Sequence, residues 1–119
     1  MATFTKNIRT LYAENGLAAG TSATGASTNI STALGIDVTA KVTNGTAPTL
    51  PCNVHVEVSG DDSAYYEWAA GSAGVAASTT YYLTFPDIRG PKYVRVRFEG
   101  HTANAVTATA VGHEITSIA

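Results

Sequence analysis

The sequence predicts a small all-β domain: an antiparallel β-sandwich, jelly-roll or immunoglobulin-like, preceded by an extended N-terminal arm. From residue 30 onward, short segments alternate apolar and polar residues, the period of two expected for strands with one buried face. Turn residues (Gly, Pro, Asn and Asp) separate these segments at intervals of about ten residues, as in sandwiches. The length, 119 residues, fits a single hydrophobic core.

The first 29 residues lack this pattern. Residues 1–17 are rich in Thr, with apolar side chains scattered among them, and we expect an extended arm or an edge strand. Residues 18–29 (AAGTSATGASTN) contain no large apolar side chain, so they bury too little surface to offset the entropy of ordering. We therefore divide the chain into an N-terminal arm and low-complexity loop, 1–29, and a β-sandwich domain, 30–119.

The second part contains six or seven predicted strands. They cover residues 36–42, 52–58, 65–70, 79–85 and 93–99, followed by 105–111 and 112–118, which form either one last strand or a bent pair. The clearest alternation is in 52–58, where Val54 and Val56 alternate with His55 and Glu57. In 93–99, the side chains of Val94, Val96 and Phe98 are expected to face the core together.

Composition excludes several classes of function. A net charge of −2 gives no overall attraction to nucleic acid or to an anionic membrane. No stretch of 18 apolar residues predicts a spanning helix, and residues 1–12 contain no hydrophobic signal core. We therefore expect neither nucleic acid nor a membrane as partner, and folding in a cytoplasm.

Reactive side chains give no convincing catalytic or metal site. Cys52 lies on the apolar side of its strand, which favours a small core residue over a nucleophile. His55 and Glu57 share the polar side of that strand and suit a metal-ligand pair, but cross-strand salt bridges to Arg95 or Arg97 are the simpler interpretation. We expect no enzyme activity, catalytic residue, metal or cofactor.

For each of two charged clusters, the sequence allows either a binding role or a purely structural role. Asp61 and Asp62 suit calcium binding or, more simply, the hydrogen bonds of a Gly-Asp-Asp-Ser turn. The second cluster is basic and consists of Arg89, Lys92, Arg95 and Arg97. It suits nucleic-acid binding or, more simply, pairing with acidic residues on neighbouring strands.

Aromatic residues are the main candidates for an interaction surface. In a strand, one member of each doublet Tyr65-Tyr66 and Tyr81-Tyr82 must face outward, and Trp68 follows the first doublet closely. Exposed Tyr and Trp are typical of protein interfaces and of sugar-stacking platforms. A sheet-edge position with the hydroxyl in water is the alternative.

Two segments carry a resemblance to a known group of proteins. Residues 54–68 (VHVEVSGDDSAYYEW) and 89–100 (RGPKYVRVRFEG) resemble patterns in tailed-bacteriophage structural proteins, over about residues 52 to 115. Asp62 stands where that pattern usually has Gly, and similar patterns occur in sugar-binding sandwiches. The resemblance covers none of the first 30 residues.

This resemblance implies a virion protein assembled in the host cytoplasm. The function that it suggests is a capsid cement or decoration protein, a homotrimer that binds the major capsid protein and bridges capsomers. Alternatives are a neck, tail or fibre-associated sandwich, and a carbohydrate-binding module that uses surface Tyr and Trp on glycans. The expected partner-binding residues are Phe4, Ile8, Leu11, Tyr12, Tyr65, Tyr66, Trp68, Tyr81 and Tyr82.

Overall fold

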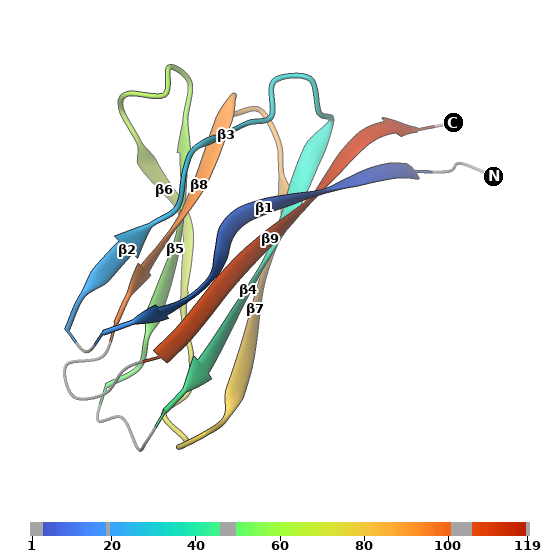
Figure 1. Ribbon diagram of the computed structural model, residues 1–119. Coiled ribbons are helices and arrows are strands. Elements are labelled where there is room, and N and C mark those ends of the chain that lie inside the picture. The colour runs from blue at the N-terminus through green and yellow to red at the C-terminus, as the bar shows by residue number, and fades with distance from the viewer. Residues whose placement is uncertain (1–3, 19, 46–49, 101–105, 119) are drawn as a thin grey trace.

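The protein is an antiparallel β-sandwich, as predicted. The computed structural model describes residues 4–18, 20–45, 50–100 and 106–118, except the side chains of residues 4, 5, 117 and 118. In this part of the chain, nine strands form two antiparallel sheets packed face to face (Figure 1). The same residues contain no helix, and so none that is long and apolar enough to cross a membrane.

The two sheets have different memberships. Sheet A contains, in spatial order, β1 (Phe4–Leu17), β9 (Val106–Ile118), β4 (Gly35–Asn44) and β7 (Thr80–Ile88). Sheet B contains β2 (Ser22–Thr24), β8 (Tyr93–Glu99), β5 (Asn53–Ser59) and β6 (Tyr66–Ser72), and β3 (Thr28–Asn29) also pairs with β8.

The strand pairing identifies the topology as a jelly roll. β5 pairs with β6, β4 with β7, β2 and β3 with β8, and β1 with β9. These pairs are nested around the β5–β6 connection, like one long hairpin whose successive sections lie in alternate sheets. Such a rolled hairpin is the double-sheet jelly roll, so the structure decides between the two predicted topologies.

The core lies between the inner faces of the sheets. In β5, Val54 and Val56 are fully buried, and in β8 so are Val94, Val96 and Phe98, which confirms the alternation predicted for both strands. Burying one such side chain contributes roughly 1.5 to 3 kcal/mol. The inner positions of β4 and β9 are buried as well; they include Val38, Ala40, Val42, Ala108 and Ala110.

Residues 4–18 and 20–29 belong to the sandwich, in contrast to the expected division at residue 30. β1 pairs with β9 from Phe4 to Leu17, and Leu11 and Leu17 lie in the common core. β2 and β3 pair with β8, and the Gly25 N–H donates to the Val96 carbonyl at 2.9 Å. A strand ladder needs only backbone groups, so the low-complexity segment becomes ordered without large side chains of its own.

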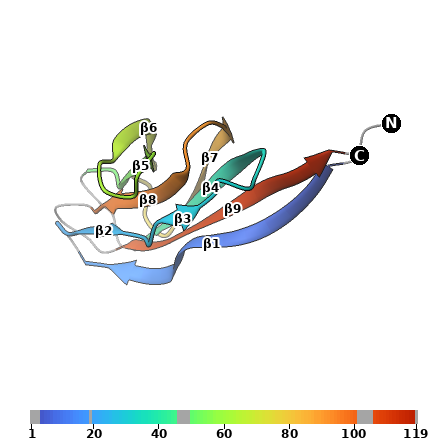
Figure 2. The ribbon, with the colours of Figure 1, turned by 90° about the horizontal axis from the view of Figure 1, so that it is seen from above.

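β1 and β9 continue together past the rest of the sheet. β4 reaches only to the Gly35–Ile115 pair, whereas β1 and β9 remain paired as far as Phe4 and Ile118 (Figures 1 and 2). Where this two-stranded extension begins, Arg9 forms an ion pair of 2.6 Å with the buried carboxylate of Glu114. The two ends of the described chain therefore lie side by side.

Candidate functional site

The predicted partner-binding residues fall into two groups. Four are exposed: Ile8 at 72%, Tyr66 at 70%, Tyr82 at 68% and Trp68 at 43%. The others that the structure describes lie wholly or partly inside. Leu11 is buried, and the Tyr12 ring packs against Phe98 with the centroids 5.0 Å apart, because the inner side of β1 covers the core. The Phe4 side chain lies outside the described residues.

The inner tyrosine of each doublet has an internal partner. The Tyr65 hydroxyl donates to Asp62, and the Arg95 guanidinium lies 3.7 Å from the centre of the Tyr65 ring. The Tyr81 hydroxyl accepts a hydrogen bond from the Ala76 N–H at 3.3 Å. Tyr66 and Tyr82 are the exposed members. Tyr82 follows the alternation of β7, whereas Tyr66, Glu67 and Trp68 are all exposed at the bulged start of β6.

One exposed pair occupies an edge strand of sheet B. Tyr66 and Trp68, which we call the β6 aromatic edge, lie on β6, whose hydrogen-bonded neighbour among the described strands is β5. Val56 pairs with Ala69 and Glu57 with Glu67, so Trp68 is the extra residue of a β-bulge. A bulge increases the local twist of an edge strand and redirects its side chains.

A second surface is the outer side of sheet A. The outward residues of β9, β4 and β7 align in three cross-strand rows. The rows are Val111, Thr39 and Thr84; Thr109, Lys41 and Tyr82; and Thr107, Thr43 and Thr80. Ile8 and Thr10 of β1 continue this surface on one side, and Asp37 and His113 lie at one end. We call the whole set the sheet A face.

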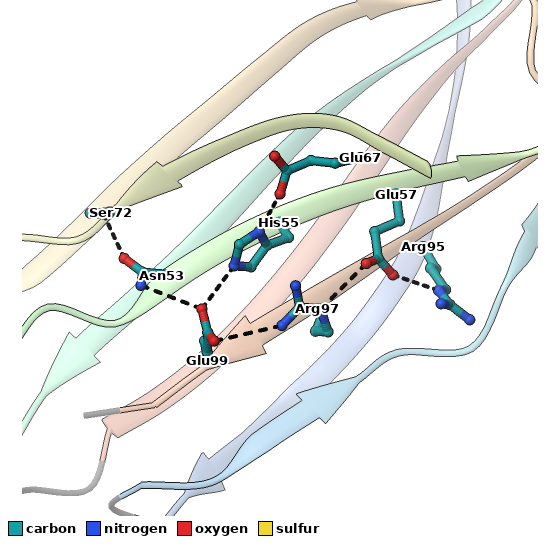
Figure 3. A network of polar contacts seen from close by, with 8 residues as sticks. All are labelled: Asn53, His55, Glu57, Glu67, Ser72, Arg95, Arg97 and Glu99. Atoms are coloured by element: carbon teal, nitrogen blue, oxygen red, sulfur yellow. Dashed lines mark hydrogen bonds and ion pairs between the residues drawn. The ribbon is translucent and has the colours of Figure 1, made fainter. Parts of the chain in front are cut away.

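The outer side of sheet B is polar in a different way. Its side chains form a connected set of hydrogen bonds and ion pairs, the sheet B network (Figure 3). The members are Asn53, His55, Glu57, Glu67, Ser72, Arg95, Arg97 and Glu99. Glu57 accepts from Arg95 Nε at 2.8 Å and from Arg97 Nε at 3.3 Å, so the predicted salt bridges of Glu57 are confirmed.

His55 has carboxylate partners instead of arginines. Its Nδ1 lies 2.5 Å from Glu67 Oε1, and its Nε2 lies 3.0 Å from Glu99 Oε1. A neutral imidazole has one N–H, so it donates to both carboxylates only when doubly protonated. Burial lowers the pKa of His55, but the hydrogen bonds to Glu67 and Glu99 outweigh it, and the net pKa is raised. The charged ring thus joins β5 to both neighbouring strands.

Two of the three acids of the network, Glu57 and Glu99, have pKa values shifted in the opposite direction. Burial raises the pKa of Glu57, but hydrogen bonds from Arg95 and Arg97 outweigh it, and the net pKa is lowered. Hydrogen bonds from His55 and Asn53 lower the pKa of Glu99. The network is therefore most stable when His55 is charged and both carboxyls are ionised.

The remaining candidate reactive groups have structural roles. Cys52 is fully buried, as predicted, and burial together with the Glu99 charge raises its pKa to about 11, which keeps the thiol protonated at neutral pH. Asp61 Oδ1 accepts the backbone N–H groups of Ser63 and Ala64 at 2.9 and 3.0 Å, which confirms its turn role. Within the described residues, no three His, Cys, Asp or Glu side chains are grouped to hold a metal.

The basic residues are divided among separate contacts. Arg89 pairs with Asp87 at 2.8 Å, while Arg95 and Arg97 share Glu57. The Lys92 ammonium lies 5.6 Å from the centre of the Tyr93 ring. Arg95 and Arg97 thus pair with a carboxylate on a neighbouring strand, as predicted, whereas Arg89 pairs locally with Asp87.

The fold and its surfaces define a jelly-roll β-sandwich with a self-compensated polar side and a nearly uncharged side. No protein family matches this chain, and no curated protein matches it. Solved structures do match. A chain of infectious bursal disease virus, Gx strain, aligns at a TM-score of 0.64 and 15% identity, over 95% of this chain and 32% of that one. This chain thus spans about a third of that viral chain.

Two further matches cover nearly whole chains. The disulfide-linked pili of Bacillus endospore appendages align at a TM-score of 0.57 and 16% identity, over 98% of this chain and 90% of that one. The SPBc2 prophage-derived protein YomS aligns at 0.54 and 16% identity, over 93% and 95%. At these identities the matches show a shared fold.

Proposed function

We propose that this protein is a structural component of a bacteriophage virion, a capsid cement or decoration protein that stabilises the head by bridging capsomers. The observation that carries the proposal is the presence of exposed apolar side chains on two separate surfaces, the β6 aromatic edge and the sheet A face. A protein that holds two neighbours together needs two such surfaces. The resemblance of residues 52–115 to phage structural proteins supports the same role, and so does a fold shared with a virus-particle chain and a prophage-derived protein.

The mechanism would be mechanical. Tyr66 and Trp68 project from the edge of sheet B, where a rigid aromatic side chain buries about 150 to 250 Å² against a partner. Such residues carry a large share of the binding energy of many interfaces. We assign the β6 aromatic edge to the major capsid protein, so that separating two capsomers would require exposing this surface to water.

The test uses particles that lack this protein. Purified protein is added back, and copies per particle and the temperature of genome release are measured. We expect copy numbers comparable to the number of capsomers and a higher release temperature. The double variant Tyr66→Ser/Trp68→Ser should bind at least tenfold more weakly. The matched control is Ala70→Ser, at an exposed position of the same strand.

Each alternative function has its own outcome. A few copies located at the neck or tail would move the protein to the second candidate role and overturn the cement function. A Trp68 fluorescence change on adding glycans, with no binding to particles, would favour a carbohydrate-binding module. Absence of the protein from particles under all conditions would overturn any virion role.

A further inference from the structure

We infer that the sheet A face is an interface between two copies of this chain, related by a two-fold axis that places Lys41 of each copy opposite Asp37 of the other. This inference concerns the chain itself and does not depend on a virion role. It rests on the composition, the hydrogen bonding, the charge pattern and the area of the face.

The side chains of the sheet A face can be covered by a partner at a low cost in free energy. Six of the nine side chains in its three rows are Thr and one is Val. These β-branched side chains lose little conformational freedom when they are covered. Two hydroxyl contacts are already internal: Thr43 Oγ1 lies 2.9 Å from Thr80 Oγ1, and Thr109 Oγ1 donates to the Tyr12 carbonyl at 2.9 Å. Covering these groups therefore leaves fewer polar atoms without a partner.

The two sheets differ in how their charges are satisfied. In the sheet B network, the charges of Glu57 and His55 are compensated within the chain. Lys41, at the centre of the sheet A face, has no ion pair within the described part of the chain, and its neighbours in the row are Thr109 and Tyr82. Apart from Asp37 and His113 at one end, the face around Lys41 is neutral, and an uncompensated cation there indicates a carboxylate on the covering partner.

The same strand supplies that carboxylate. Asp37 lies four residues before Lys41 on β4 and faces the same side, because the strand alternates. Its Oδ1 accepts the Asp87 N–H at 2.7 Å, a bond that occupies one of its two oxygens. A two-fold axis at Thr39, in the interface and perpendicular to β4, exchanges positions 37 and 41. Each copy then supplies one Lys and one Asp, and the ion pair forms twice.

The same axis places Val111, the Val of the three rows, opposite Val111 of the second copy. This follows because Val111 is paired in register with Thr39 and therefore lies beside the axis. The strands of the two stacked sheets then run in opposite directions, which aligned packing of sheets accommodates. Val111 is consequently the position where an added charge would face its own copy.

The area fits a reversible association. Four strands about 4.8 Å apart and ten residues long at about 3.3 Å each give a face of roughly 600 Å² per copy. The total of about 1,200 Å² lies at the lower limit of specific interfaces. We therefore expect a dimer that dissociates on dilution, in contrast to the homotrimer expected from the resemblance. The β6 aromatic edges of both copies, which belong to sheet B, remain uncovered.

Sedimentation velocity over a range of concentrations tests the inference. The mass should rise from 12.3 kDa toward twice that value as concentration increases. Lys41→Asp and Val111→Arg should each weaken association at least tenfold. Thr24→Arg, at an exposed position of β2, adds the same charge off the face and should leave association unchanged.

A charge exchange gives the decisive result. Equimolar Lys41→Asp and Asp37→Lys should associate with each other, since every opposed pair in the mixed dimer is then complementary. Circular dichroism of each variant verifies that it is folded, and Val111→Arg tests the face without altering Asp37. A monomer at every concentration, a trimeric mass, or a dimer unaffected by Lys41→Asp and Val111→Arg would each overturn the inference. Particle binding by a strictly monomeric protein would overturn the dimer and leave the proposed function intact. A dimer that binds no particle would support the dimer and overturn the proposed function.

Discussion

Two apolar residues of β1 distinguish an integral strand from a detachable arm. Leu11 is 2% exposed and belongs to the core, whereas Ile8, three residues earlier on the same strand, is 72% exposed. Replacing a buried Leu by Ala removes its transfer free energy and leaves a cavity, which together cost about 2 to 5 kcal/mol. Replacing an exposed side chain usually changes stability by less than about 0.5 kcal/mol. We expect a loss of about 3 kcal/mol for Leu11→Ala and almost none for Ile8→Ala.

The loss should be easy to measure. For 119 residues, an unfolding entropy of about 2.1 cal/mol/K per residue means that 3 kcal/mol lowers the melting temperature by roughly 12 °C. Guanidinium unfolding followed by Trp68 fluorescence gives the free energy directly, with Ile8→Ala as the matched control. If Leu11→Ala unfolds at the same denaturant concentration as wild type, β1 is not part of the cooperative core and the assignment of residues 4–17 to the sandwich fails.

Further predictions concern the sheet B network and the close approach of the two sheets. The folded-state pKa of His55 is raised above 6.5, so its stabilisation is present below pH 6.5 and is lost as pH rises through the folded value. Because both carboxylate partners are about half exposed, the loss is roughly 0.5 to 1 kcal/mol. Denaturant titrations should show this decline in wild type and not in His55→Gln; a decline of equal size in both would assign it to another group. A methyl group at Gly25 would overlap the Leu11 carbonyl, while Gly60 has open space, so Gly25→Ala should lower the melting temperature and Gly60→Ala should not. Equal melting temperatures for these two variants would contradict the packing of β1 on sheet B.

Sequence patterns predicted the strands whose side chains alternate clearly. The buried positions of β5 and β8 follow from the period of two, and so does the exposure of Tyr82 relative to Tyr81. The salt bridges of Glu57 were predictable as well, because Glu57 and Arg95 stand on the outer sides of two antiparallel strands and meet in register. In each case the local pattern determines which side chains share a face.

Local sequence patterns do not predict which distant segments pair with each other. β1 has few large apolar residues, and its partner β9 lies some hundred residues later in the sequence. For these reasons no local pattern predicts that Leu11 faces the core. His55 meets Glu67 only because a bulge at Trp68 shifts the register of β6. The rows of the sheet A face likewise depend on the register of three strands that are separate in the sequence.

The pairing of β1 with β9 also constrains how the protein is made. A ribosome releases β1 early, but the strand that will hold it is translated about 5 to 20 seconds later, at 5 to 20 residues per second. During that interval the nascent jelly roll is an incomplete sheet with an open side. Lys6, Arg9 and Glu14 place charges along the waiting strand, and such charges discourage it from pairing with a neighbouring nascent chain. Completion of this fold therefore waits until β9 has been translated, and a chain truncated before β9 would leave β1 without its partner strand.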